Sequence, residues 1–149
     1  MNISLIESLK PDLIIANKEE NVKEQVAALE KICPVWISDI TTIDDALAMM
    51  QSMGEIFFVQ EKAKELIDSI QHNFQQLQSF EKIKVIYLIW QQPMMTVGAD
   101  TFIHQLLLKA GLENVFGNQQ RYPEISDEQI NESAAEYILL SSEPFPFKE

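Results

Sequence analysis

The segment from Ile83 to Ile89 constrains the fold most strongly, because it is apolar apart from one lysine and rich in β-branched and aromatic residues. Such a run is typical of a strand buried on both faces of a parallel sheet. Asp100 is placed as the N-cap of a following helix, and Gly111 as the left-handed residue that ends it. We therefore predict a strand, a loop over residues 91–99, and a capped helix.

The loop after this strand is the first place where we expect function. Open α/β sheets bind their ligands at the carboxyl ends of their strands. Trp90, Pro93 and Met94 lie at this point, and a second loop carries Arg121 and Tyr122 before a predicted helix. Aromatic and methionine side chains offer broad polarizable surface, and arginine pairs with carboxylates. The two loops are typical of a site for a large planar or anionic ligand. An equally good interpretation is that Trp90 and Tyr122 only cover the hydrophobic core beneath their loops.

The rest of the chain predicts three regions. Residues 1–38 alternate helix, strand, helix and strand, as parallel-sheet layers do. Residues 39–80 contain two amphipathic runs with no strand, and Gly54 is expected to interrupt the first. Residues 81–149 resume the alternation. We therefore predict an α/β fold in which two parallel-sheet lobes with flanking helices are joined by a long helical connector.

Local capping signals place two of the helices. Thr41 or Thr42 is the expected N-cap of the first helix in the region 39–80. Ser126 is followed three residues later by glutamine, which is the capping-box pattern of a helix start. We expect Ile130 and Ala134 to be the buried positions of that helix.

Charge and composition exclude several classes of protein. The net charge of −12 argues against nucleic-acid binding, which needs a basic face. The single cysteine, Cys33, excludes an intrachain disulfide framework. No apolar run approaches the ~20 residues of a membrane span. The amino-terminal residues lack the basic region, apolar core and cleavage site of a signal peptide.

Motifs for catalysis or metal binding are missing from the sequence. It has no P-loop, no G-x-G-x-x-G and no G-x-S-x-G. His72 and His104 lie on different predicted helices without metal-ligand spacing, so each is expected to be a satisfied or solvent-facing histidine. An enzyme that uses Cys33 as its nucleophile is a further hypothesis, but no neighbouring residues in the sequence support it. We predict a protein that is not an enzyme and supplies no metal ligands.

Several ordered groups of residues carry a family resemblance. They are the run Ser8–Ala16, the motif Trp90-x-x-Pro93 with Thr96-x-Gly98, the triplet Asn114–Phe116, and the run Arg121–Glu128. Their order resembles that of the helical-backbone substrate-binding proteins of ABC importers, the class that includes vitamin B12-binding, Fe(III)-siderophore and haem receptors. Proteins of this class have two α/β lobes joined by a rigid helix and bind ligand between the lobes. The resemblance implies that residues 42–80 contain the backbone helix. It also implies that the two-lobed fold is incomplete at both ends.

The resemblance also implies roles for individual residues. The residues expected to contact ligand are Trp90, Pro93, Met94, Arg121 and Tyr122 in the second lobe, and Asn17 in the first. The vitamin B12-binding class carries an aromatic residue at the position of Asn17, so this chain departs from it there. Glu128 matches a glutamate that docks on the permease. The corresponding position in the first lobe is Ser4, and Glu7 one turn away is the nearest candidate.

The leading hypothesis is a substrate-binding component of an ABC importer for a metal chelate. The expected ligand is a ferric siderophore, haem or cobalamin, recognised by its organic envelope, so no resident cofactor is expected. The expected partners are the chelate, the transporter permease and, through sheet edges left open, a second copy of the chain. The resemblance implies a periplasmic or membrane-anchored extracytoplasmic location. The alternative hypothesis is a cytosolic α/β interaction or regulatory domain without a transport role.

Overall fold

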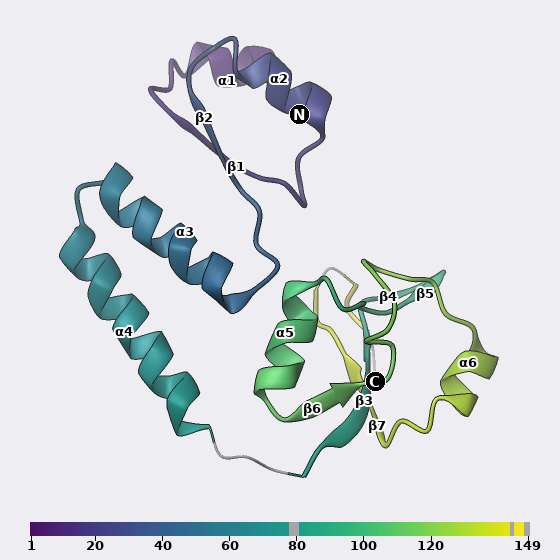
Figure 1. Cartoon of the computed structure of the whole chain (residues 1–149). Helices are drawn as coiled ribbons and strands as arrows, with labels where there is room; N and C mark the ends of the chain where they lie inside the picture. The colour runs from purple at the N-terminus through teal and green to yellow at the C-terminus, as the bar shows by residue number, and fades with distance from the viewer. Residues whose placement is uncertain (78–80, 144, 148–149) are drawn as a thin grey trace. The chain divides into compact units, whose positions relative to one another are not determined.

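A computed structural model describes residues 1–77, 81–143 and 145–147 of the chain (Figure 1). The chain divides into two compact units, Met1–Ile40 and Thr41–Glu149.

The first unit is a two-stranded parallel sheet with two short helices. Its elements are α1 (Ile3–Ser8), β1 (Ile14–Asn17), α2 (Lys23–Leu29) and β2 (Val35–Ser38). Ile14 pairs with Val35, and the register continues to the ends of both strands. Val26 and Leu29 of α2 are buried together with Ala16 of β1. The predicted order of helix, strand, helix and strand is confirmed.

The second unit begins with two helices that pack on each other, α3 (Ile43–Ile56) and α4 (Gln60–Gln76) (Figure 1). Thr42 caps α3 in a capping box with Asp45. The prediction that Gly54 interrupts this helix is wrong. Gly54 lies inside α3 and is buried, and a Cβ added there would be 2.5 Å from the Cβ of Ala63. The glycine therefore allows α4 to approach closely.

The rest of the second unit contains a three-stranded parallel sheet. Its strands are β3 (Ile83–Leu88), β6 (Leu112–Asn114) and β7 (Tyr137–Leu140), in the order β6-β3-β7. The helices α5 (Phe102–Lys109) and α6 (Asp127–Glu132) lie on opposite sides of β3 in Figure 1. Residues at alternate positions of β3 belong to two hydrophobic clusters, Val85 with Leu107 and Ile86 with Phe116. The prediction that β3 is covered on both faces is confirmed.

The ends of α5 confirm one cap and correct the other. Gly111 follows the helix with φ of 77°, as predicted. The prediction that Asp100 is the N-cap is wrong by one residue. Thr101 holds that place, and its hydroxyl oxygen accepts a hydrogen bond from the backbone N–H of His104 at 3.2 Å. The Asp100 carboxylate instead accepts from the backbone N–H of Arg121.

The predicted capping box of α6 is present, but the helix is shorter than expected. Ser126 and Gln129 satisfy each other's backbone N–H groups, as the sequence pattern indicates. The helix ends at Glu132, so Ala134 lies beyond it, is exposed and has φ of 54°. The prediction that Ala134 is buried is therefore wrong. Ile130 and Ala135 pack against the core instead.

Candidate functional site

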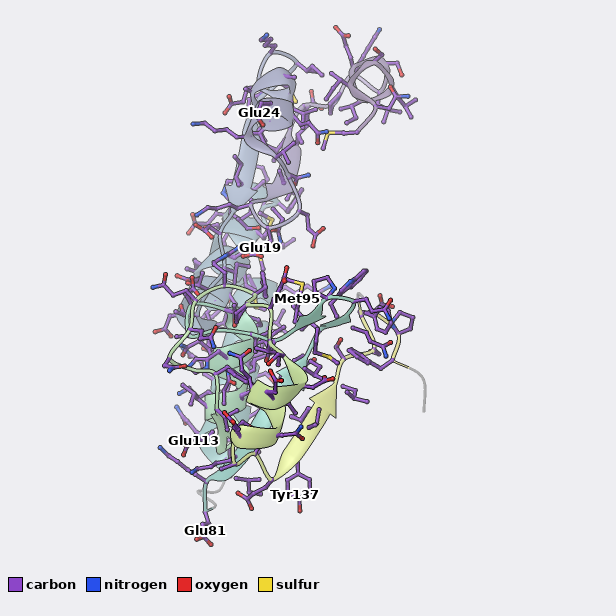
Figure 2. All side chains as sticks on the ribbon, turned by 90° about the vertical axis from the view of Figure 1, so that its right-hand side faces the viewer. Glu19, Glu24, Glu81, Met95, Glu113 and Tyr137 are labelled. Carbon is purple, nitrogen blue, oxygen red and sulfur yellow. The ribbon has the colours of Figure 1, made fainter. Side chains whose placement is uncertain are left out.

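The predicted loop after β3 contains a short hairpin. Its strands are β4 (Trp90–Gln91) and β5 (Met94–Met95), which pair antiparallel with Trp90 opposite Met95. The peptide bond between Gln92 and Pro93 at the turn is cis. Figure 2 shows Met95 at the opposite end of the three-stranded sheet from Glu81, Glu113 and Tyr137. The hairpin therefore lies at the carboxyl edge of the sheet.

The structure brings the two predicted loops together. Residues 94–99 and 119–125, which we call the paired loops, run side by side and are joined by backbone hydrogen bonds. The bonds run from the N–H of Thr96 to the oxygen of Pro123 (3.1 Å), from Ile125 to Met94 (2.9 Å), from Gly98 to Arg121 (2.7 Å) and from Ala99 to Gln119 (2.7 Å). Met95 and Glu124 form an antiparallel bridge between the same segments. The two loops are thus one structural element.

Gly98 makes the close approach of the paired loops possible. A Cβ at this position would be 2.6 Å from the carbonyl oxygen of Gln119 and 2.7 Å from the carbonyl carbons of Gln119 and Gln120. These are backbone atoms, which cannot rotate away as a side chain can. Thr96 fixes the same segment from the core side, because its buried hydroxyl donates to the oxygen of Tyr87 at 2.8 Å.

Asn114, at the end of β6, ties the base of the paired loops to α5. Its amide nitrogen donates to the oxygen of Val97 at 2.8 Å and lies 3.2 Å from Nδ1 of His104. Its amide oxygen accepts from the N–H of Phe116 at 3.1 Å. Both Asn114 and His104 are buried, so these bonds satisfy groups that water does not reach. Of the two alternatives expected for His104, satisfied or solvent-facing, the structure shows the first.

Trp90 is the predicted ligand contact with the most accessible aromatic surface. Its side chain is 38% exposed, and its indole N–H donates to the oxygen of Gln92 at 3.0 Å. The Phe145 ring meets it edge to face, with 5.3 Å between the ring centroids. The indole is therefore oriented by its own hairpin and by a residue that follows β7.

Phe145 and Phe147 extend this aromatic surface, and neither was predicted from the sequence. Their ring centroids are 4.8 Å apart, and the rings are again edge to face. Ser141 donates its N–H to the oxygen of Leu88 at 3.0 Å, so β7 ends beside the end of β3. The signal that could have revealed the pair is a Phe-Pro-Phe segment soon after a strand of the same parallel sheet.

Arg121 and Tyr122 are placed differently from each other. Arg121 is exposed, has φ of 56°, and its guanidinium carbon lies 5.3 Å from the centroid of the Tyr122 ring. Tyr122 is half-buried and packs against the cluster of Val85, Val97 and Leu107. The tyrosine therefore supports the core as well as the loop, while the arginine stays at the surface.

The other predicted site residues range from core to surface. Pro93 is exposed at the hairpin turn, and Met94 packs against the cluster of Ile86 and Leu88. Asn17, in the first unit, accepts a hydrogen bond from the N–H of Glu19 at 2.7 Å through its side-chain oxygen. The two predicted docking residues are both exposed, Glu7 on α1 and Glu128 in the first turn of α6.

Two hollows of the second unit differ in their lining. One of about 650 Å³ lies among helices and is lined by residues of α3, α4 and α5, none of which is a predicted site residue. A smaller one of about 410 Å³ is lined by Gln91, Phe145, Pro146 and Phe147. Within the described ranges, no group of three histidine, cysteine, aspartate or glutamate side chains is placed to hold a metal ion. We take the smaller hollow as the candidate site because it adjoins Trp90.

This chain belongs to the periplasmic binding protein family, which matches residues 1–146. It is 26% identical to a vitamin B12-binding protein of Pectobacterium carotovorum over 152 residues, covering 97% of this chain and 55% of the relative. The chain thus spans little more than half the length of this relative. Family members are binding proteins, and no helix in the described part of the chain has the length and apolarity of a membrane span.

Solved structures show the same fold. The periplasmic vitamin B12-binding protein of Vibrio cholerae is 25% identical with a TM-score of 0.83, and the match covers 95% of this chain and 58% of that one. The periplasmic haem-binding protein of the same organism has a TM-score of 0.80 at 19% identity, covering 95% of this chain and 58% of that one. The second likeness shows the fold alone. The predicted α/β binding-protein fold is confirmed.

Proposed function

We propose that this chain contributes to substrate binding in an ABC importer for a metal chelate, and that ligand contacts the carboxyl edge of its three-stranded sheet. The observation that carries the proposal is the paired loops with the half-exposed Trp90 beside them. Pre-formed sites with aromatic surface and a few polar groups are typical of ligand binding. Membership of the periplasmic binding protein family supports capture rather than catalysis.

The proposed ligand is a ferric siderophore, haem or cobalamin. Each chelate holds its metal within an organic envelope, so binding needs no metal ligand from the protein. Trp90 and Arg121 would meet that envelope, with Pro93, Met94 and Tyr122 supporting the loops around them. A contact from Asn17 stays a prediction for the first unit.

Equilibrium dialysis against cyanocobalamin, haemin and ferrioxamine B would test the proposal. Dialysis is preferable to direct quenching, because these chelates absorb where tryptophan emits. Trp90→Leu removes the proposed contact. We expect saturable binding of at least one chelate, with a loss of about ten-fold in Trp90→Leu for about 1.4 kcal/mol of lost contact. Absence of saturable binding for all three would refute the proposal.

We further propose that Glu128 docks on the permease, with Glu7 as the counterpart on the first unit. Both carboxylates are exposed, as a rim charge at a docking surface must be. Glu128→Lys should lower chelate-stimulated ATPase activity of permease vesicles. Glu132→Lys is the matched control, because Glu132 is exposed at the other end of the same helix. Equal loss in both variants would count against a specific role for Glu128.

The location and self-association belong to the same proposal. We propose a periplasmic or membrane-anchored extracytoplasmic location, as the relatives' descriptions suggest. The strand β7 is at an edge of its sheet, and its side chains Tyr137, Ile138 and Leu140 are exposed by 60%, 48% and 54%. Such an edge can pair with a second copy of the chain. Sedimentation equilibrium of wild type and Ile138→Lys would test this, with dimer lost in the variant.

A further inference from the structure

Three aromatic residues form a continuous surface beside the candidate site, which we call the aromatic wall: Trp90, Phe145 and Phe147. The interplanar angles are 67° between Trp90 and Phe145 and 68° between Phe145 and Phe147. Edge-to-face packing of this kind is a favoured aromatic geometry. Trp90 is exposed and Phe145 and Phe147 are half-buried, so part of each residue remains accessible to a further molecule.

The aromatic wall is held in place from both ends. Phe147 packs against the core cluster that includes Ile86 and Leu88. Its N–H donates to the oxygen of Phe145 at 3.0 Å, which closes a three-residue turn around Pro146. At the other end, the indole of Trp90 is fixed by its bond to the oxygen of Gln92. A surface ordered before binding loses little conformational entropy when ligand arrives.

Among the described residues, none of those that line the hollow next to the wall carries a charge. Of the described lining residues, Gln91 carries an amide group, and Phe145, Pro146 and Phe147 have apolar side chains. A flat conjugated ring has the shape and polarizability to cover such a wall. An aliphatic chelate with a globular outline offers no ring face for these side chains to meet.

We propose that the segment Phe145–Phe147 is a specificity element that, with Trp90, selects ligands presenting a flat macrocyclic ring over aliphatic chelates. The inference rests on the proposed function, which it narrows to one shape of ligand. The sequence predicted ligand contacts in this unit only in the two loops. The inference adds a contact from the segment that follows β7. Phe145 is the central residue, because it alone contacts both other rings of the wall.

The test uses Phe145→Leu, which keeps an apolar side chain and removes the ring. The probes are zinc protoporphyrin, metal-free protoporphyrin and ferrioxamine B, each measured by equilibrium dialysis. We expect the Kd of both porphyrins to rise about five-fold, or ~1 kcal/mol, and the Kd of ferrioxamine B to stay unchanged. Phe145→Tyr keeps the ring and should bind the porphyrins within about two-fold of wild type.

Phe58→Leu is the matched control for non-specific porphyrin adsorption, because Phe58 is 86% exposed in the turn between α3 and α4. It should leave every Kd unchanged. The inference is overturned if Phe145→Leu binds porphyrin as wild type does, if it loses both chelate shapes equally, or if Phe58→Leu has the same effect. Circular dichroism of each variant shows whether a lost fold causes the change.

The same titrations separate this inference from the proposed function. Binding of ferrioxamine B without porphyrin binding overturns the specificity element and leaves chelate capture standing. Binding of metal-free protoporphyrin that depends on Phe145, without binding of any metal chelate, supports the aromatic wall and refutes chelate capture. Absence of binding to all three probes refutes the specificity element, and chelate capture is refuted as well if cyanocobalamin and haemin also fail to bind.

Discussion

Replacement of Gly98 by alanine should separate the paired loops. The added Cβ would lie 2.6 Å from the oxygen of Gln119 and 2.7 Å from the carbonyl carbon of Gln120. Backbone must move to relieve these contacts, since no flexible side chain is involved. The movement would break the bonds that Gly98 and Ala99 donate to the opposite segment, each of which is 2.7 Å long.

The expected loss of stability follows from these contacts. Two backbone hydrogen bonds contribute about 1 kcal/mol each to the net free energy of unfolding. Overpacking in a closely packed region costs about 1–3 kcal/mol. The sum is about 3–5 kcal/mol, which is a large part of the stability of an ordinary domain. The midpoint of urea unfolding should fall by about 1 M or more.

Urea unfolding followed by tryptophan fluorescence would measure this loss. The Trp36→Phe background restricts the signal to Trp90, which reports on the second unit. Gly111→Ala is the control, because nothing lies within 4 Å of a Cβ added there and only its φ of 77° disfavours alanine. That control should cost about 1–2 kcal/mol. A loss for Gly98→Ala no greater than for Gly111→Ala would refute the steric reasoning.

Three further predictions concern buried or capping polar groups. Asn114→Ala should cost about 3 kcal/mol in urea unfolding, because it leaves buried groups of Val97 and Phe116 without their bonds; a loss below 1 kcal/mol would contradict this. Ser141→Ala should raise stability by about 1 kcal/mol, because the buried hydroxyl oxygen has no partner among the described residues; a lower midpoint would count against it. Hydrogen bonds led by the Thr42 side chain lower the pKa of Asp45 from 3.8 to about 2. The ionised Asp45 carboxylate therefore stabilises the folded state above pH 4, and this stabilisation is lost as the pH falls through 2. Asp45→Asn should therefore be less stable than wild type at pH 6, with the difference shrinking near pH 2, and a pH-independent difference would oppose this assignment.

The sequence predicted helices and strands correctly where the residues that determine them are neighbours in the chain. The apolar run of β3, the capping box at Ser126 and the left-handed Gly111 depend on neighbouring residues in the sequence, and the structure confirms all three. One error arose where two adjacent residues could each cap the same helix. Asp100 and Thr101 are both good capping residues, and the structure uses Thr101 as the cap because Asp100 binds the distant backbone of Arg121.

The helical region shows how tertiary contact can reverse a local inference. A glycine within a helical pattern lowers helix propensity, so Gly54 suggested an interruption. Its lack of a Cβ instead lets Ala63 of α4 approach, and that packing holds the glycine within α3. The residue pattern of one helix does not show which residues of the next helix pack against it.

The sequence by itself determined the alternation of strands and helices and the strand β3, which is buried on both of its faces. It also determined the two loops at the carboxyl edge of the three-stranded sheet. Only the tertiary structure decided that these loops pair, that Gly98 and Asn114 are the residues holding them, and that Phe145 meets Trp90. The physical reason is the range of the interactions. Hydrophobic periodicity and helix caps act over a few residues, whereas these contacts join segments that come together only when the sheet has formed.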